Sequence, residues 1–203
     1  MSKALVVDLD GTLYAINTFH AFLKFVLKIA IKRLYFMLFF SIFSVIVLRG
    51  FKLISHARMK YVVLKSIRNY NINYERFVNK ISKYKRNLKI LKDSKANFKI
   101  LATAAPSCYA YIIAKNEKFD LCLGTDFPEL GFKKDFENIQ LNKKNSVLKA
   151  INDNNLNGVE TVVTDHVDDF PLIQIADKTI LVKPDSKLIS KLKQNLISFE
   201  VIE

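Results

Sequence analysis

The segment Lys3–Tyr14, KALVVDLDGTLY, decides the fold of this chain and introduces its chemistry. Ala4–Val7 has the pattern of a short buried strand, and it runs into an acidic turn that contains glycine. Asp8 and Asp10 are two residues apart, so their side chains can share one orientation, one as nucleophile and the other as acid and base. Gly11 permits close backbone approach, and the N–H groups of such a turn can bind an anion. On its own, Asp-x-Asp-Gly is also a common loop sequence.

The spacing of the strands outlines the architecture around this segment. The next strand of the same kind is Phe98–Ala102, about eighty residues later, whereas a crossover between parallel strands needs only a dozen or so. We therefore expect a separate helical module after the first strand. Helix and strand patterns then alternate: helix 105–116 (with Pro106 in its first turn), strand 119–124, helix 143–153, strand 159–165, helix 169–177, strand 178–183 and helix 186–195. This alternation predicts an α/β fold with a doubly wound, mostly parallel, Rossmann-like sheet.

Polar residues collect where three of these strands end: Asp8 and Asp10, then Thr103, then Asp165 with Asp168 and Asp169. In such sheets ligands bind beyond the carboxyl ends of the strands. Acids or a threonine at a helix start can be simple caps, and that reading stays open for any one of them. Two acidic clusters at neighbouring strand ends would repel each other without a cation, and Mg²⁺ prefers such oxygen ligands. A hydroxyl beside a helix start suits phosphate.

Together these positions resemble the motifs of the haloacid dehalogenase superfamily of phosphohydrolases, in its phosphoserine-phosphatase-like branch. DLDGTL resembles the first motif, Thr103 in ILATAAP the second, and TDHVDDFPLI the fourth, with Asp165 and Asp169 at its acidic positions. In ENIQLNKKNSVL the spacing from Asn138 points to Lys144 as the third-motif lysine, with Lys143 as the fallback. Three residues depart from the usual motifs without removing a catalytic group: Leu141, Thr164 and His166, the last of which we interpret as structural or exposed.

The resemblance implies a role for each matched residue. Asp8 would form an aspartyl-phosphate, and Asp10 would protonate the leaving alcohol and then activate water. Mg²⁺ would be held by Asp8, Asp10 and Asp165, with Asp169 at or beside the metal. The phosphoryl oxygens would be bound by four residues: Gly11, Thr103, Ala104 and Lys144. A helical cap at about residues 15–94 would cover a catalytic core made of residues 1–14 and 95–203.

Charge is distributed unevenly along the chain. The net charge is +13, and the interval Gly11–Tyr74 contains ten lysines and arginines and no acidic residue. A solvated basic helix face is the plainest interpretation of such a run. Because these charges alternate with large apolar side chains, an anionic lipid surface suits them better than nucleic acid.

The run Leu34–Leu48 has fifteen uncharged residues between basic flanks. As one helix it would extend about 22 Å, short of the roughly 30 Å hydrocarbon core of a membrane. A membrane span and a fully buried cap helix remain alternatives. The favoured interpretation is a helix, apolar all round, that lies in the membrane interface without crossing it.

The expected function combines the catalytic motifs with the apolar and basic character of the cap. TFHAFLKFVLK, residues 18–28, resembles the corresponding region of membrane-associated phosphatidylglycerophosphate phosphatases. We expect a Mg²⁺-dependent phosphatase of a lipid-linked phosphomonoester, attached to the cytoplasmic face of the membrane, since no secretory signal is expected and Cys108 and Cys122 fit reduced thiols. A soluble phosphomonoester substrate and a catalytically idle membrane-binding protein are the alternatives. The leaving group and the oligomeric state are left open.

Overall fold

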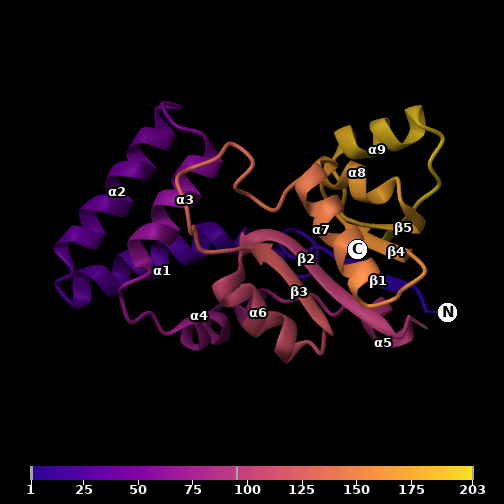
Figure 1. The fold of residues 1–203 in the computed structure, drawn as a ribbon, viewed down its shortest axis with the longest axis horizontal. Helices are drawn as coiled ribbons and strands as arrows, with labels where there is room; N and C mark the ends of the chain where they lie inside the picture. The colour runs from indigo at the N-terminus through magenta and orange to yellow at the C-terminus, as the bar shows by residue number, and fades with distance from the viewer. Residues whose placement is uncertain (1, 95, 203) are drawn as a thin grey trace.

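The structure, a computed structural model, describes residues 2–94 and 96–202 and has a six-stranded sheet at its centre (Figure 1). Its strands are β1 Ala4–Val7, β2 Phe98–Pro106, β3 Leu121–Thr125, β4 Val159–Thr164, β5 Ala176–Val182 and β6 Glu200–Ile202. Each pairs in parallel with its neighbours in the order β3-β2-β1-β4-β5-β6, which confirms the predicted doubly wound α/β sheet. The order reverses beside β1, so the carboxyl end of β1 is where ligands bind in sheets of this type.

Helices cover both faces of the sheet because the residues of β1 alternate between two cores. On one face α7 Leu141–Asp153, α8 Phe170–Ile173 and α9 Ser186–Gln194 pack with Ala4 and Val6. On the other face α6 Ser107–Asn116 packs with Leu5 and Val7, and this second core continues into the helical insertion. The insertion and the sheet are therefore joined by shared apolar packing.

Three details differ from the sequence expectations. Pro106 ends β2 in an extended conformation and precedes α6, instead of lying in the first turn of that helix. The predicted helix 169–177 is reduced to the 3₁₀ turn η2 Val167–Asp169 and the short α8, because β5 already begins at Ala176, where it pairs with Val159 of β4. The three-residue strand β6 was not predicted.

The insertion between β1 and β2 is helical, as expected. It contains α1 Thr18–Lys32, α2 Phe36–Gly50, α3 His56–Ile67, α4 Tyr74–Ile81, the 3₁₀ turn η1 Ser82–Tyr84 and α5 Ile90–Asp93. The side chains of Asn17, Ser55 and Asn73 cap α1, α3 and α4 by accepting hydrogen bonds from N–H groups of their first turns. We refer to this insertion as the cap, and its exact limits at residues 15 and 94 stay a prediction.

The charge-free run Leu34–Leu48 lies almost wholly in one helix, α2, and only Leu34 and Tyr35 precede it. Leu34 has a φ of 55°, in the left-handed region, so the chain turns there between α1 and α2. Only Leu38, Ile42 and Val45 of α2 are buried, at the i, i+4, i+7 spacing of one helix face. This exposure contradicts the fully buried alternative, and no helix in the described part of the chain is both long enough and apolar enough to cross a membrane.

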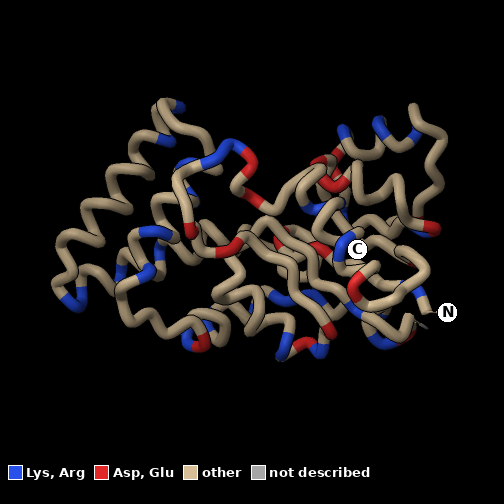
Figure 2. Tube along the Cα trace, in the orientation of Figure 1, with Lys and Arg blue, Asp and Glu red and all other residues tan. Residues whose placement is uncertain are grey.

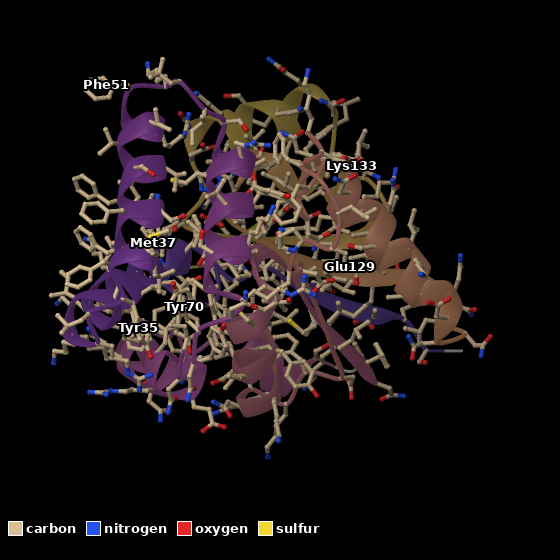
Figure 3. The ribbon with its side chains drawn as sticks, turned by 60° about the vertical axis from the view of Figure 1, so that its left-hand side comes forward. Tyr35, Met37, Phe51, Tyr70, Glu129 and Lys133 are labelled. Carbon is tan, nitrogen blue, oxygen red and sulfur yellow. The ribbon has the colours of Figure 1, made fainter. Side chains whose placement is uncertain are left out.

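The outer side of α2 forms an exposed apolar surface. The side chains on it share high exposure, reaching 81% for Met37. In Figure 3 the side chains on the outer side of α2 point away from the rest of the protein, with Phe51 at one end. Lysine and arginine lie at both ends of α2 (Figure 2). We call this surface the apolar patch; it consists of Ile31, Leu34, Phe36, Met37, Phe40, Phe43, Val47, Leu48, Phe51 and Leu53.

Candidate active site

A pocket of about 700 Å³ lies at the carboxyl end of β1, between the sheet and the cap. Pockets of a few hundred to about 1,000 Å³ are typical of small-molecule sites. Among the residues predicted to act in the site, Lys144 is missing from the lining and Lys143 stands in its place. The other predicted residues all line the pocket: Asp8, Asp10, Gly11, Thr103, Ala104, Asp165 and Asp169.

Asp8 directly follows β1 and is paired with a lysine. Its Oδ1 lies 2.7 Å from Nζ of Lys143, and both side chains are almost fully buried. Burial raises the pKa of Asp8 to about 8, although the charge of Lys143 acts in the opposite direction. A carboxylate in this position needs further positive charge nearby to remain ionised at neutral pH.

The structure brings Lys143, not Lys144, into the site, which corrects the preference for Lys144. Since α7 begins at Leu141, Lys143 falls on the same buried face as Val147 and Ala150, whereas Lys144 lies one residue, about 100°, further round the helix. Burial works against the charge of Lys143, but the carboxylates of Asp169 and Asp8 raise its pKa, so the ammonium stays protonated.

Asp169 is engaged on both of its oxygens. Oδ1 lies 2.6 Å from Nζ of Lys143, and Oδ2 accepts a hydrogen bond of 2.6 Å from the hydroxyl of Thr164. This arrangement orients Lys143 toward Asp8. Both oxygens of Asp169, which the sequence analysis placed at or beside the metal, are thus occupied by protein donors. The hydrogen bond from Thr164 also explains why a threonine can stand at this position of the fourth motif.

Asp10 is linked to the first helix of the cap. Its Oδ1 accepts a hydrogen bond of 2.7 Å from the backbone N–H of Thr18, the first residue of α1. Burial raises the pKa of Asp10, and the hydrogen bonds of Thr18 oppose this effect. A partly buried carboxyl group with a raised pKa is suited to donating a proton.

Gly11 allows two loops to meet. It has a φ of 82°, and a Cβ atom built on it would lie 1.9 Å from Oδ2 of Asp165, so a side chain here would collide with that carboxylate. Asp165 is held by a hydrogen bond of 2.9 Å from the hydroxyl of Thr12. Arg86, which the sequence analysis did not identify, donates hydrogen bonds to the carbonyl oxygens of Gly11 and Thr12 and fixes this turn from the cap side.

Thr103 and Ala104 contribute from β2. Thr103 is buried, and its hydroxyl accepts a hydrogen bond of 3.0 Å from the N–H of Ala105. The carbonyl oxygen of Ala104 accepts hydrogen bonds from Nζ of Lys60, at 2.6 Å, and from the hydroxyl of Thr125, at 2.8 Å. The peptide groups that follow Thr103 are therefore held in place by residues of both the cap and the core.

A buried ion pair joins the cap to the core, and sequence reasoning missed it. Lys60 of α3 pairs with Glu137 of the loop between β3 and α7, and Nδ1 of His56 lies 2.9 Å from Oε1 of the same carboxylate. Burial disfavours ionisation of Glu137, but His56 and Lys60 together lower its pKa. No motif signals this contact, because its partners come from distant segments.

His166 also lies at the pocket, on its core side. It is about half-exposed, and its Nδ1 lies 3.3 Å from Oδ2 of Asp168. The hydrogen bond with Asp168 raises the pKa of His166. This half-exposed position fits the expected exposed histidine, and it faces the ligand space. The other two histidines of the chain, His20 and His56, line the pocket as well.

The donor set of the pocket fits Mg²⁺. No group of three His, Cys, Asp or Glu side chains is already arranged around a metal position within residues 2–94 and 96–202. Mg²⁺ needs less, because one or two carboxylates together with waters commonly hold it. Asp8 and Asp165 face the same pocket, and burial raises the pKa of both carboxyl groups. A divalent cation would offset the cost of keeping them ionised.

Comparison with protein families finds one match. A family model described as haloacid dehalogenase-like hydrolase matches residues 5–174, which is most of the chain. A search of curated proteins finds no match.

Several solved structures share the fold over nearly the whole chain. A protein of unknown function from Bordetella pertussis Tohama I superposes with a TM-score of 0.75 at 13% identity, covering 100% of this chain and 99% of that one. A HAD-family hydrolase from Salmonella enterica serovar Typhi reaches 0.60 at 13% identity, covering 98% and 66%. A phosphoserine phosphatase, solved as a phospho-aspartyl intermediate analogue, reaches 0.60 at 12% identity, covering 100% and 94%.

Proposed function

This chain belongs to the haloacid dehalogenase-like hydrolase family, and on that premise we propose that it is a Mg²⁺-dependent phosphomonoester hydrolase that works through an aspartyl-phosphate on Asp8. The observation that carries the proposal is the pair of carboxylates at the end of β1. Asp8 faces Lys143 in the pocket, while Asp10 lines the same pocket and is bound to the start of α1. The phosphoserine phosphatases that share this fold support the choice of a phosphate ester.

In the first half-reaction Asp8 acts as the nucleophile. A carboxylate oxygen of Asp8 forms a bond to phosphorus while the bond between phosphorus and the leaving oxygen breaks. Asp10 gives its proton to that oxygen, so the alcohol leaves neutral. The raised pKa of Asp10 favours the protonated form that this step requires.

In the second half-reaction the roles of Asp10 reverse. Asp10, now ionised, takes a proton from a water molecule whose oxygen attacks phosphorus, and the bond to Asp8 breaks. Phosphate leaves, Asp8 is again a carboxylate and Asp10 is again protonated. The net change is the conversion of one phosphomonoester and one water into one alcohol and one phosphate.

The remaining residues bind the charge that the phosphoryl group carries. Lys143 and Thr103 would contact its oxygens, together with backbone N–H groups at Gly11 and Ala104. Asp169 and Thr164 hold Lys143 in position before the substrate arrives, so little reorganisation is needed during the reaction. Mg²⁺, held by Asp8, Asp165 and the backbone carbonyl of Asp10, would neutralise charge on the phosphoryl oxygens.

The test is phosphate release from an aryl phosphate and from a panel of phosphomonoesters, with Mg²⁺ and with a chelator. We expect Asp8→Asn to lower kcat by at least roughly 10³-fold, because the nucleophile is lost. Asp93→Asn, an exposed aspartate of the cap, is the matched control and should leave kcat unchanged. Full activity of Asp8→Asn, or of the wild type in excess chelator, would overturn the proposal.

We further propose that the substrate is lipid-linked, at the cytoplasmic face of a membrane. The apolar patch supports this choice, since an exposed surface of this extent usually has a partner. Lys32 and Arg33 at one end and Lys52 at the other are exposed and suit anionic headgroups. Phosphatidylglycerophosphate is the specific substrate suggested by the sequence resemblance, and a soluble phosphomonoester is the alternative.

Vesicles separate these two substrate classes. We expect the protein to float with vesicles that contain phosphatidylglycerol, to bind less well at high salt, and to release phosphate faster from a lipid phosphomonoester in the bilayer than from a soluble ester. A protein that ignores anionic vesicles and acts faster on soluble esters has a soluble substrate. Vesicle binding without any phosphatase activity would identify the catalytically idle alternative.

A further inference from the structure

The two halves of the pocket differ in charge. The core contributes six carboxylates to the lining. One is Glu137, and the other five, from Asp8, Asp10, Asp165, Asp168 and Asp169, have Lys143 among them. The cap side contributes His20, Arg49, His56 and Lys60 and no carboxylate, since the chain has no acidic residue from Gly11 to Tyr74. A phosphoryl group and its cation belong on the core side. The leaving group must therefore face the cap side.

Two of these cap residues already have a partner. Lys60 is fully buried, pairs with Glu137 and donates to the carbonyl oxygen of Ala104. His56 shares the carboxylate of Glu137 through Nδ1. Glu137, which comes from the core loop, faces these two cap residues, and the two contacts use its carboxylate. It is thus not available to bind a cationic group of a ligand.

Arg49 is in the opposite situation. It lies in the last turn of α2, is exposed and lines the pocket. The structure gives its guanidinium a single hydrogen bond, of 3.3 Å, from Nη1 to the carbonyl oxygen of Ile54. Over residues 2–94 and 96–202 it has no ion-pair partner. A guanidinium has five N–H donors, so most of them remain for a ligand.

We propose that Arg49 binds a second anionic group on the leaving alcohol of the substrate. This assignment rests on the proposed phosphatase function and adds the class of substrate: a phosphomonoester whose alcohol portion carries a carboxylate or a phosphodiester. The fork of donors on Arg49 matches the paired oxygens of such groups. A leaving group with an ammonium would meet Arg49 without an unpaired carboxylate on the cap side to receive it, so the pocket disfavours it.

Three soluble esters of similar size test the charge preference directly. They are 3-phosphoglycerate, whose alcohol carries a carboxylate, glycerol 3-phosphate, whose alcohol is neutral, and phosphoethanolamine, whose alcohol carries an ammonium. Each is tested as a competitor of aryl phosphate hydrolysis and, without turnover, by calorimetry on Asp8→Asn with Mg²⁺. We expect 3-phosphoglycerate to bind best and phosphoethanolamine worst.

Variants then assign the preference to Arg49. Arg49→Gln should weaken the binding of 3-phosphoglycerate by roughly 10- to 100-fold, the usual effect of losing a charge-assisted hydrogen bond. In turnover the loss should appear mainly in KM. The same variant should bind glycerol 3-phosphate within about twofold of the wild type, and Arg49→Lys should restore part of the lost affinity for 3-phosphoglycerate. Lys65→Gln removes the same charge from another helix of the cap, outside the pocket lining, and is the matched control.

Several results would overturn the assignment. These are equal binding of the three esters, a preference for phosphoethanolamine, or an equal loss for all three in Arg49→Gln. The calorimetric arm keeps this outcome separate from the proposed function. An enzyme without aryl phosphatase activity whose Asp8→Asn form still ranks the esters by charge would refute the hydrolase and support the anion site.

Discussion

Proteins usually expose charged side chains and bury apolar ones, and the core and the cap of this chain each depart from one half of this rule. The core buries charge: Lys143, Asp8 and Asp169 are almost fully enclosed. The cap exposes apolar side chains, and Phe40 and Phe51 are more than half exposed. Each arrangement is costly for an isolated domain, since buried charges lose hydration and exposed apolar groups order water. Costs of this kind mark the two places where the protein would meet something else, a phosphate in the core and a surface at the cap.

The largest expected effect tests the buried charge of the core. Lys143→Ala should lower kcat/KM by roughly 10³-fold, because the phosphoryl charge and Asp8 both lose their buried cation. Lys144→Ala, one residue away on the half-exposed side of α7, should change it by less than about threefold. Steady-state phosphate release measures both variants, and circular dichroism verifies that they fold. Equal losses would return the role to Lys144 or to the helix as a whole.

The second prediction concerns the contact where the two regions meet. Lys60→Met should destabilise the protein by about 3–5 kcal/mol, since Glu137 would remain buried without its main cation. Lys65→Met, an exposed lysine on the same helix, should stay within about 0.5 kcal/mol of the wild type. Urea unfolding followed by circular dichroism is suitable because the chain has no tryptophan. A small loss in Lys60→Met would mean that water or His56 supports Glu137 instead.

The third prediction tests the cap side. Phe40→Asp should weaken binding to phosphatidylglycerol vesicles by roughly 10- to 100-fold, because a large apolar side chain is lost from the apolar patch and a negative charge is gained. Activity on a soluble ester should not change. Tyr111→Asp, an equally exposed aromatic residue on α6 of the core, is the control and should bind vesicles almost as well as the wild type. The same loss in both variants would show that net charge, rather than the patch, controls binding.

The smallest expected effect is a pH dependence at the junction. The pKa of Glu137 is lowered from its ordinary value of 4.5, despite burial, by His56 and Lys60. Its stabilising contribution is therefore fully present above about pH 4.5 and is lost as the pH falls through the lower pKa of the folded state. The difference in unfolding free energy between the wild type and Glu137→Gln should shrink from pH 6 to pH 3. A difference that grows on acidification would contradict this.

The sequence was most informative where chemistry and strand ends coincide. Asp8, Asp10 and Asp165 could be placed because each follows a recognisable buried strand, and Thr103 because it lies in the carboxyl-terminal half of another. Parallel strands bring their carboxyl ends to one edge. The choice between Lys143 and Lys144 failed because the facing of a helical residue depends on where the helix begins. That start, at Leu141, has no side-chain cap to announce it.

The cap was harder to predict for a different reason. The length of the charge-free run was visible, and from Phe36 onward the run is one helix, but Leu34 gives no sign that it turns the chain with a positive φ just before that helix. The pairing of Lys60 with Glu137 and the contact of Arg86 with Gly11 join segments that are far apart in the sequence. Such contacts depend on how whole elements pack, and no local pattern encodes them.

The hydrogen bond from the N–H of Thr18 to Asp10 connects the proposed catalytic acid directly to the cap. The first N–H groups of a helix lack partners within it, and here one of them is satisfied by the proposed acid itself. An ionised carboxylate accepts such a bond more strongly than a protonated one. In the proposed cycle this hydrogen bond would therefore strengthen when Asp10 has given up its proton and weaken when the proton returns, which would couple each turnover to the first helix of the cap.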